Sequence, residues 1–159
     1  MSLRIGFGYD IHRLVPDRAL WLGGIEIPFE KGLLGHSDGD AIAHALCDAQ
    51  FGAVGLGDIG EHFPDSDPSW KNISGKVLLE QTRIILTARN AKLVQADLTV
   101  LAEAPRISPH KESMIHQLEK ATGCRDVSIK ARTNEGLDSV GRGDAIAVYA
   151  MVLVEWDRV

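Results

Sequence analysis

The sequence is poor in cysteine, carries no excess of positive charge and has no long apolar run. Its 159 residues hold 17 Lys and Arg against 22 Asp and Glu. That balance argues against a general nucleic-acid binder, because such proteins are basic. Two isolated cysteines, Cys47 and Cys124, do not form a disulfide framework. No run approaches the roughly 20 apolar residues that span a bilayer, and no signal-peptide pattern is present. We therefore expect a cytoplasmic protein with no membrane and no nucleic-acid partner.

The remaining composition is that of a globular protein, with 45% hydrophobic and 25% charged residues. This balance is rich enough to bury a core. The length favours one domain, expected over residues 1–159. The sequence shows no repeat and no linker, and its one region rich in chain breakers, residues 57–75, is interpreted as a functional loop.

Hydrophobic periodicity predicts an α+β fold. Strands are expected at residues 3–14, 19–29, 93–103, 127–133 and 145–154, and helices at 38–54, 74–89 and 109–123. The second strand is expected to return beside the first as an N-terminal hairpin, bent at Gly23 and Gly24. We expect a mixed sheet of about four main strands with helices on one face. The last strand is apolar from Ala145 to Val154, which predicts cover on both faces, the second supplied by another subunit.

A candidate metal site lies in the first half of the chain. Asp10 and His12 share one face of the first strand, because residues i and i+2 of a strand point the same way. His44 lies on the first helix, within a polar stripe that also fits an ordinary solvated face. Together the three side chains would give a zinc ion three ligands and leave a fourth position open, as in catalytic sites. Asp38 and Asp40 also fit structural caps of the helix N-terminus.

Two further clusters admit both a structural and a functional interpretation. The acidic, glycine-rich segment 57–68 is either a structural loop or a lid that contacts the hydroxyls of a polyol. Residues 130–143 combine cations, a hydroxyl and a carboxylate after a strand. This cluster is either a surface turn or a phosphate site in which Glu135 holds a magnesium-like cation.

These motifs, taken in order, resemble the 2-C-methyl-D-erythritol 2,4-cyclodiphosphate synthase family along essentially the whole chain. The runs that carry the resemblance are Asp10-Ile11-His12, His36-Ser37-Asp38-Gly39-Asp40 with His44, Gly57-Asp58-Ile59-Gly60, Phe63-Pro64-Asp65-Ser66-Asp67-Pro68, Ala104-Pro105-Arg106, Thr133-Asn134-Glu135 and Gly141-Arg142-Gly143. The resemblance implies an isoprenoid-pathway enzyme. It would convert 4-diphosphocytidyl-2-C-methyl-D-erythritol 2-phosphate into the cyclic diphosphate with release of CMP. It also implies a homotrimer with active sites between subunits.

The resemblance further implies roles for individual residues. Asp10, His12 and His44 match zinc ligands, Glu135 matches the residue at a magnesium or manganese ion, and His36 and Thr133 match positions that stabilise the transition state. The other matches are to substrate-binding positions. His36 and Ser37 match phosphate contacts, and Asp58, Ile59 and Gly60 match the polyol-binding turn, with Phe63, Pro64, Asp65, Ser66 and Asp67 beside it. A wall of the cytidine pocket is matched by Ala102, Ala104, Pro105, Arg106, Ile107 and Ser108, and positions beside the phosphates by Arg132 and Asn134. Arg142 is also matched to a substrate-binding position. In some members the arginine matched by Arg142 faces an axial cavity able to hold an isoprenoid diphosphate. Arg132, Gly136 and Ser139 depart from residues common among relatives.

Two other functions remain open at this point. A zinc-dependent phosphoester hydrolase would use the same Asp10, His12 and His44 to activate water. A non-catalytic trimer that binds isoprenoid diphosphates would use Arg142 alone, and would leave the acidic loop and Glu135 without a role.

Overall fold

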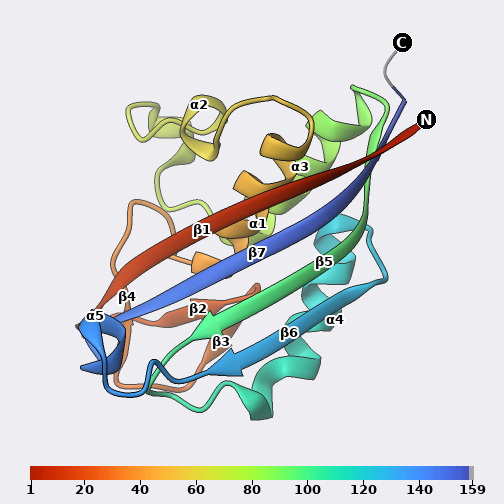
Figure 1. Cartoon of the computed structure of the whole chain (residues 1–159). Helices are drawn as coiled ribbons and strands as arrows, with labels where there is room; N and C mark the ends of the chain where they lie inside the picture. Colours follow the sequence, from red (N-terminus) through yellow and green to blue (C-terminus); the bar gives the residue numbers. More distant parts are fainter. Residues whose placement is uncertain (158–159) are drawn as a thin grey trace.

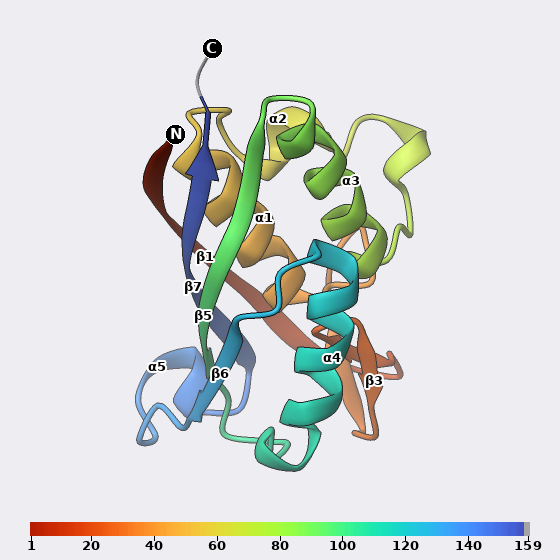
Figure 2. The same ribbon diagram turned by 90° about the vertical axis from the view of Figure 1, so that its right-hand side faces the viewer.

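The protein is built in two layers, a sheet and a set of helices packed on one of its faces (Figures 1 and 2). The computed structural model describes residues 1–157, so the last two residues of the expected domain 1–159 lie outside the described part. The strands are β1 (Ser2–Pro16), β2 (Leu20–Leu22), β3 (Ile25–Ile27), β4 (Lys31–Leu33), β5 (Ala91–Leu101), β6 (Val127–Arg132) and β7 (Ala145–Trp156). The α-helices are α1 (Ala41–Ala53), α2 (Ile59–His62), α3 (Gly75–Thr87), α4 (Lys111–Thr122) and α5 (Asp138–Gly141), with 3-10 turns at Pro68–Trp70 and Ser108–His110.

The main sheet has five strands in the order β4-β1-β7-β5-β6. β7 runs antiparallel to both β1 and β5. β5 and β6 are parallel, and α4 lies between them in the chain, as a parallel crossover requires. Four long strands and the three-residue β4 make a mixed sheet, and the expected α+β class with helices on one face is confirmed (Figure 2).

The predicted pairing of the second strand is wrong. Residues 19–29 do not return beside β1; they split into β2 and β3, which pair with each other as a separate hairpin. Gly23 and Gly24 both have positive φ, 60° and 76°, which a tight two-residue hairpin turn requires. The glycines therefore close a turn instead of bending one strand. The neighbours of β1 in the sheet are β4 and β7.

Helix α1 is buried on nearly every side, because it lies between the sheet and α3 (Figure 2). Only His44, Asp48 and Gly52 of this helix retain exposed surface, and they follow one another at a spacing of four residues. β1 approaches α1 through its glycine face: a Cβ on Gly6 would stand 1.8 Å from the carbonyl oxygen of Ala49. The other face of β1 consequently points away from the helices.

Helices α3 and α4 agree with the sequence predictions, whereas the short α2 and α5 were not predicted. Ser74 caps α3 by accepting a hydrogen bond from the Val77 amide. Gly123 ends α4 in the left-handed conformation with φ 74°, as is common after a helix. The region 57–75, expected as one loop, contains α2 and a 3-10 turn. Both cysteines are free and buried. None of the helices in the described part of the chain is long and apolar enough to cross a membrane.

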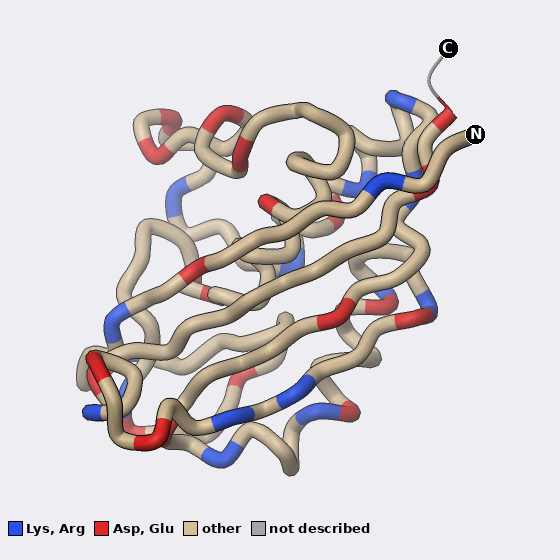
Figure 3. Tube along the Cα trace, in the orientation of Figure 1, with Lys and Arg blue, Asp and Glu red and all other residues tan. Residues whose placement is uncertain are grey.

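The sheet face away from the helices is apolar over β1 and β7. Its exposed large side chains are Leu3, Ile5, Phe7, Tyr9, Ile11, Tyr149 and Met151. Neighbouring residues of β7 differ sharply in solvent exposure, because Val148 is 0% exposed and Tyr149 is 41% exposed. Charged residues are sparse along the middle of β7 (Figure 3). The apolar last strand predicts that both faces of the sheet are covered. A single chain covers only one of them.

Candidate functional site

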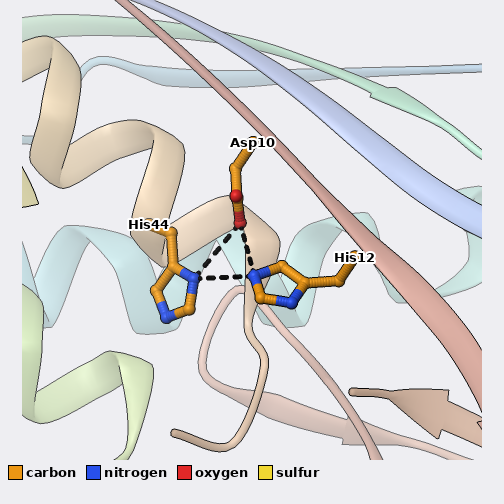
Figure 4. A group of neighbouring side chains, drawn as sticks. All are labelled: Asp10, His12 and His44. Atoms are coloured by element: carbon orange, nitrogen blue, oxygen red, sulfur yellow. Dashed lines mark hydrogen bonds and ion pairs between the residues drawn. The ribbon is translucent and has the colours of Figure 1, made fainter. Parts of the chain in front are cut away.

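Three side chains from two elements converge at the surface of α1. Asp10 and His12 project from the same face of β1, and His44 projects toward them from α1 (Figure 4). Oδ2 of Asp10 lies 2.9 Å from Nε2 of His12 and 3.2 Å from Nδ1 of His44, and the two nitrogens are 3.0 Å apart. The structure thus brings together the three residues predicted as metal ligands.

The outer nitrogen of each imidazole has a hydrogen-bond partner. Nδ1 of His12 donates to the carbonyl oxygen of Leu34 at 2.5 Å, and because a carbonyl can only accept, the neutral ring presents a lone pair at Nε2. Nε2 of His44 lies 2.9 Å from Oγ of Ser37; when it donates there, Nδ1 also presents a lone pair. Such outer hydrogen bonds orient metal-ligating histidines in proteins.

The electrostatics of the cluster keep Asp10 ionised. Burial by itself raises the pKa of Asp10, but without a metal the imidazoles of His12 and His44, which donate to the carboxylate when they are protonated, outweigh burial and lower the pKa to about 2. Burial lowers the pKa of His12, whereas its hydrogen bond to Asp10 raises it, and the net direction is upward. Burial also raises the pKa of Asp48, one turn further along α1. Asp10 therefore stays ionised and places a negative charge between the two imidazoles.

The donor set fits a divalent metal of the zinc type. Two imidazole nitrogens and one carboxylate oxygen are common zinc ligands, and three protein ligands are typical of a catalytic site. Their separations of 2.9–3.2 Å are close to the roughly 3.3 Å between ligand atoms around a tetrahedral ion with bonds near 2.0 Å.

Other polar residues of the 36–40 segment hold the backbone in place. Asp40 is fully buried and caps α1; it also accepts hydrogen bonds from the amides of Gly23 and Gly24. Asp38 accepts from the amide of Gly75 at 2.8 Å. Arg18 donates to the carbonyl oxygen of Ser37 at 2.6 Å. The interpretation of both aspartates as structural residues therefore holds.

A pocket of about 270 Å³ opens beside the three predicted metal ligands. Its lining residues are His12, Gly35, His36, Ser37, His44, Ile59, Gly60, Phe63, Asp65, Trp70, Ile73 and Leu78. His36 and Asp65 face each other, with 3.7 Å between Nε2 and Oδ2. Part of the predicted phosphate and polyol set thus shares one pocket with the candidate metal ligands: His36, Ser37, Ile59, Gly60, Phe63 and Asp65.

The other residues of the predicted acidic segment stabilise the backbone on the side of the pocket that contains Ile59, Gly60 and Phe63. Asp58 caps α2 by accepting from the Glu61 amide, and Asp67 caps the following 3-10 turn through the Ser69 amide. Pro64 and Ser66 lie between these two caps. Sequence reasoning missed the apolar side of the pocket, because Trp70 and Ile73 lie in a segment without periodicity and periodicity alone does not show what Leu78 of α3 packs against.

A second group of predicted residues follows β5 and β6, at the same end of the strands as Asp10 and His12 but toward the opposite edge of the sheet. Ala102 and Ile107 are buried, Ala104 and Pro105 are joined by a cis peptide bond, and Arg106 and Ser108 are exposed. The amide of Ala102 donates to the carbonyl oxygen of Arg132, so the two predicted segments 102–108 and 132–135 adjoin. Over the described residues, neither segment lines the 270 Å³ pocket of its own chain.

The turn at the end of β6 has an unusual backbone. Glu135 has φ 53°, a left-handed conformation that is uncommon outside glycine. Oγ1 of Thr133 donates to Oε1 of Glu135 at 3.0 Å. Glu103, which sequence reasoning missed, accepts from the Asn134 amide at 2.8 Å. The turn therefore presents Thr133 and Glu135 together at the surface.

Arg142 lies on an exposed turn after α5. Its Nε donates to Asp144 at 3.1 Å. It lines a separate hollow of about 500 Å³, with Ile11, Arg13 and Ser139 among the other lining residues. Arg142 is thus next to the open apolar face of the sheet, to which Ile11 contributes.

Comparisons with known proteins agree with this arrangement. The sequence profile of the YgbB family matches residues 3–155. The chain is 50% identical over 155 residues to the 2-C-methyl-D-erythritol 2,4-cyclodiphosphate synthase of Desulfatibacillum aliphaticivorans, covering 96% of this chain and 100% of the relative. It is 51% identical over 154 residues to the synthase of Desulfosudis oleivorans, covering 96% and 92%.

Solved structures extend the similarity to three dimensions. A synthase structure of the same name, in a form bound to CDP, has a TM-score of 0.88 and 40% identity, covering 96% of this chain and 100% of that one. The bifunctional IspDF of Campylobacter jejuni has a TM-score of 0.93 and 34% identity; this chain spans 99% of its own length but 43% of that protein. The profile match and the near full-length identity place the chain in the YgbB family, among the 2-C-methyl-D-erythritol 2,4-cyclodiphosphate synthases.

Proposed function

We propose that this enzyme is a phosphorus–oxygen lyase that converts 4-diphosphocytidyl-2-C-methyl-D-erythritol 2-phosphate into 2-C-methyl-D-erythritol 2,4-cyclodiphosphate and CMP. The observation that carries the proposal is the convergence of Asp10, His12 and His44 beside a pocket. The same pocket contains His36 and Ser37, matched to phosphate contacts, and Ile59 and Gly60, matched to polyol contacts. The names of the relatives and the CDP complex of one of them support a cytidine diphosphate substrate.

The reaction needs no side-chain nucleophile. An oxygen of the substrate's 2-phosphate forms a bond to the β-phosphorus, and the bond from that phosphorus to the bridging oxygen breaks. The bond's electron pair leaves on the phosphate of CMP. Catalysis of such a transfer is mainly positioning and neutralisation of charge.

Different side chains would bind the cations, the phosphates and the polyol. Asp10, His12 and His44 would hold zinc and Glu135 would hold magnesium or manganese. When bound, these cations polarise the phosphoryl oxygens and neutralise their charge. His36, exposed at the pocket mouth, and Thr133 would donate to phosphate oxygens. The acidic turn that begins at Asp58 would accept hydrogen bonds from the polyol hydroxyls.

The active site would be assembled from neighbouring copies in a homotrimer. Segments 102–108 and 132–135, matched to the cytidine wall and the phosphates, lie outside the pocket that the metal ligands of the same chain adjoin. The exposed apolar face of β1 and β7 supplies a surface for another copy, larger than single scattered apolar residues. A closed trimer would cover that face and bring the two groups together. The hollow beside Arg142 would then lie near the axis, where an isoprenoid diphosphate could bind.

Incubating the purified protein with the cytidine-diphosphate substrate, zinc and magnesium in ¹⁸O-water tests the reaction. We expect CMP and a cyclic diphosphate, neither of which carries ¹⁸O. Incorporation of ¹⁸O into the product would instead indicate a metal-dependent hydrolase, and absence of CMP release would indicate a binding protein without chemistry. The cytoplasmic location is tested separately, by fractionation of cells that produce the protein.

A further inference from the structure

Asp48 is a half-buried carboxylate of α1 that the predicted site does not use. It lies one helical turn after His44, in the row of residues of α1 that retain exposed surface. In the sequence such a row is typical of a solvated helix face. The structure shows instead that Asp48 has a specific backbone partner outside its own helix.

That partner is the amide of Ile59, the first residue of α2. Oδ1 of Asp48 accepts its hydrogen bond at 2.7 Å, a short contact of the kind that an ionised acceptor makes. The first amides of a helix have no partner inside the helix. Asp58, the cap of α2, serves the Glu61 amide, so the Ile59 amide depends on Asp48.

The other end of the same turn is also fixed to α1. His62, the last residue of α2, stacks on Phe51 with 4.1 Å between ring centroids, and its Nε2 donates to the Leu56 carbonyl at 2.7 Å. Phe51 is fully buried in α1. His44, Asp48 and Phe51 therefore form a row along α1, spaced four and three residues apart. His44 belongs to the candidate metal site, Asp48 binds the start of α2, and Phe51 contacts the end of α2.

We propose that Asp48 is a positioning residue that fixes the turn 58–60 at a set distance from the metal ligand His44, and so sets where the polyol hydroxyls lie relative to the reacting phosphates. The inference rests on the proposed function, in which this turn binds the polyol. The charge of the carboxylate is of secondary importance; the acceptor oxygen at this position of α1 is what holds the turn.

The test compares Asp48→Ala with Asp48→Asn in the whole purified protein. The alanine variant lacks the acceptor, and we expect KM for the substrate to rise about tenfold or more, with a fall in kcat, because the hydrogen bond that holds the turn is lost. The asparagine variant keeps an oxygen acceptor and should recover most of the activity. In both variants the zinc content and the affinity for CDP should equal those of the parent, because CDP lacks the polyol.

Thr122→Ala is the matched control. The Thr122 hydroxyl also accepts a backbone hydrogen bond, from the Cys124 amide, but at the end of α4 and away from the pocket. It should lose stability without a change in KM. An alanine variant with parental KM and kcat, or one that also loses zinc or CDP affinity, overturns the positioning role. Failure of the parent to release CMP would instead contradict the proposed function, and the two failures are therefore distinguishable.

Discussion

Gly8 and Ala45 approach so closely that a Cβ atom on Gly8 would stand 1.9 Å from the carbonyl oxygen of Ala45. That contact brings the backbone of β1 against α1 and sets the distance from Asp10 and His12 on the strand to His44 on the helix. A glycine at this position is therefore a requirement of the metal site as well as of packing.

Gly8→Ala should lower the free energy of unfolding by at least about 2 kcal/mol, because the methyl group must push the strand away from the helix. Gly52→Ala is the control: nothing lies within 4 Å of an added Cβ at that exposed helical position. It should raise stability by about 0.5–1 kcal/mol. Urea unfolding followed by circular dichroism measures both. Equal effects of the two substitutions would show that the close approach does not matter.

His44→Ala should lose bound zinc and activity while the fold survives, because the ligands lie on elements held by the apolar core. The His12→Ala variant should behave in the same way. Metal analysis by mass spectrometry, with circular dichroism to check folding, measures the outcome. Stoichiometric zinc in either folded variant would refute the ligand assignment.

Glu135→Gln should weaken the response of CMP release to magnesium while the zinc content stays unchanged. Glu135 is exposed and lies away from the zinc-type cluster of its own chain, so its loss should affect only the cation that binds with the substrate phosphates. A magnesium titration at constant zinc measures this. Superimposable titrations of variant and parent would exclude the role.

Tyr149→Asp and Val148→Asp should fail in different ways, because the two side chains point to opposite faces of β7. Tyr149 lies on the open apolar face, so the aspartate should leave a folded chain that no longer forms trimers and has no activity. Val148 is fully buried beneath the helices, so the aspartate there should prevent folding. Light scattering after size exclusion, together with circular dichroism, separates the outcomes. A trimeric, active Tyr149→Asp protein would contradict assembly through this face.

The sequence allowed the long strands, the three longer helices and the shared face of Asp10 and His12 to be predicted, since these follow from local periodicity. The shared face of Asp10 and His12 needs only the alternation of a strand, and Ser74 and Gly123 mark helix ends by local chemistry. Strand pairing is different, because it depends on contacts between distant residues. This is why residues 19–29 were wrongly paired with the first strand.

Two features of the site also lay beyond local patterns. Alternation gives β1 two faces but does not say which is covered, and the helices cover the face with Gly6 and Gly8, not the apolar one. The apolar side of the pocket comes from Trp70 and Ile73 in an irregular segment and from Leu78 on α3. Tertiary packing alone brings these three together.

The pairing of β1 with β7, from Ser2↔Trp156 to Arg13↔Ala145, has a consequence for how this protein can vary. Asp10 and His12 occupy one set of alternate positions on β1, and Tyr9 and Ile11 occupy the other. Inserting or deleting a single residue near the start of the strand would exchange the two sets, turning the ligands outward and the apolar side chains toward α1. Changes in length within β1 should therefore be tolerated only in steps of two residues, whereas the loop between β1 and β2 should accept insertions or deletions of any number of residues.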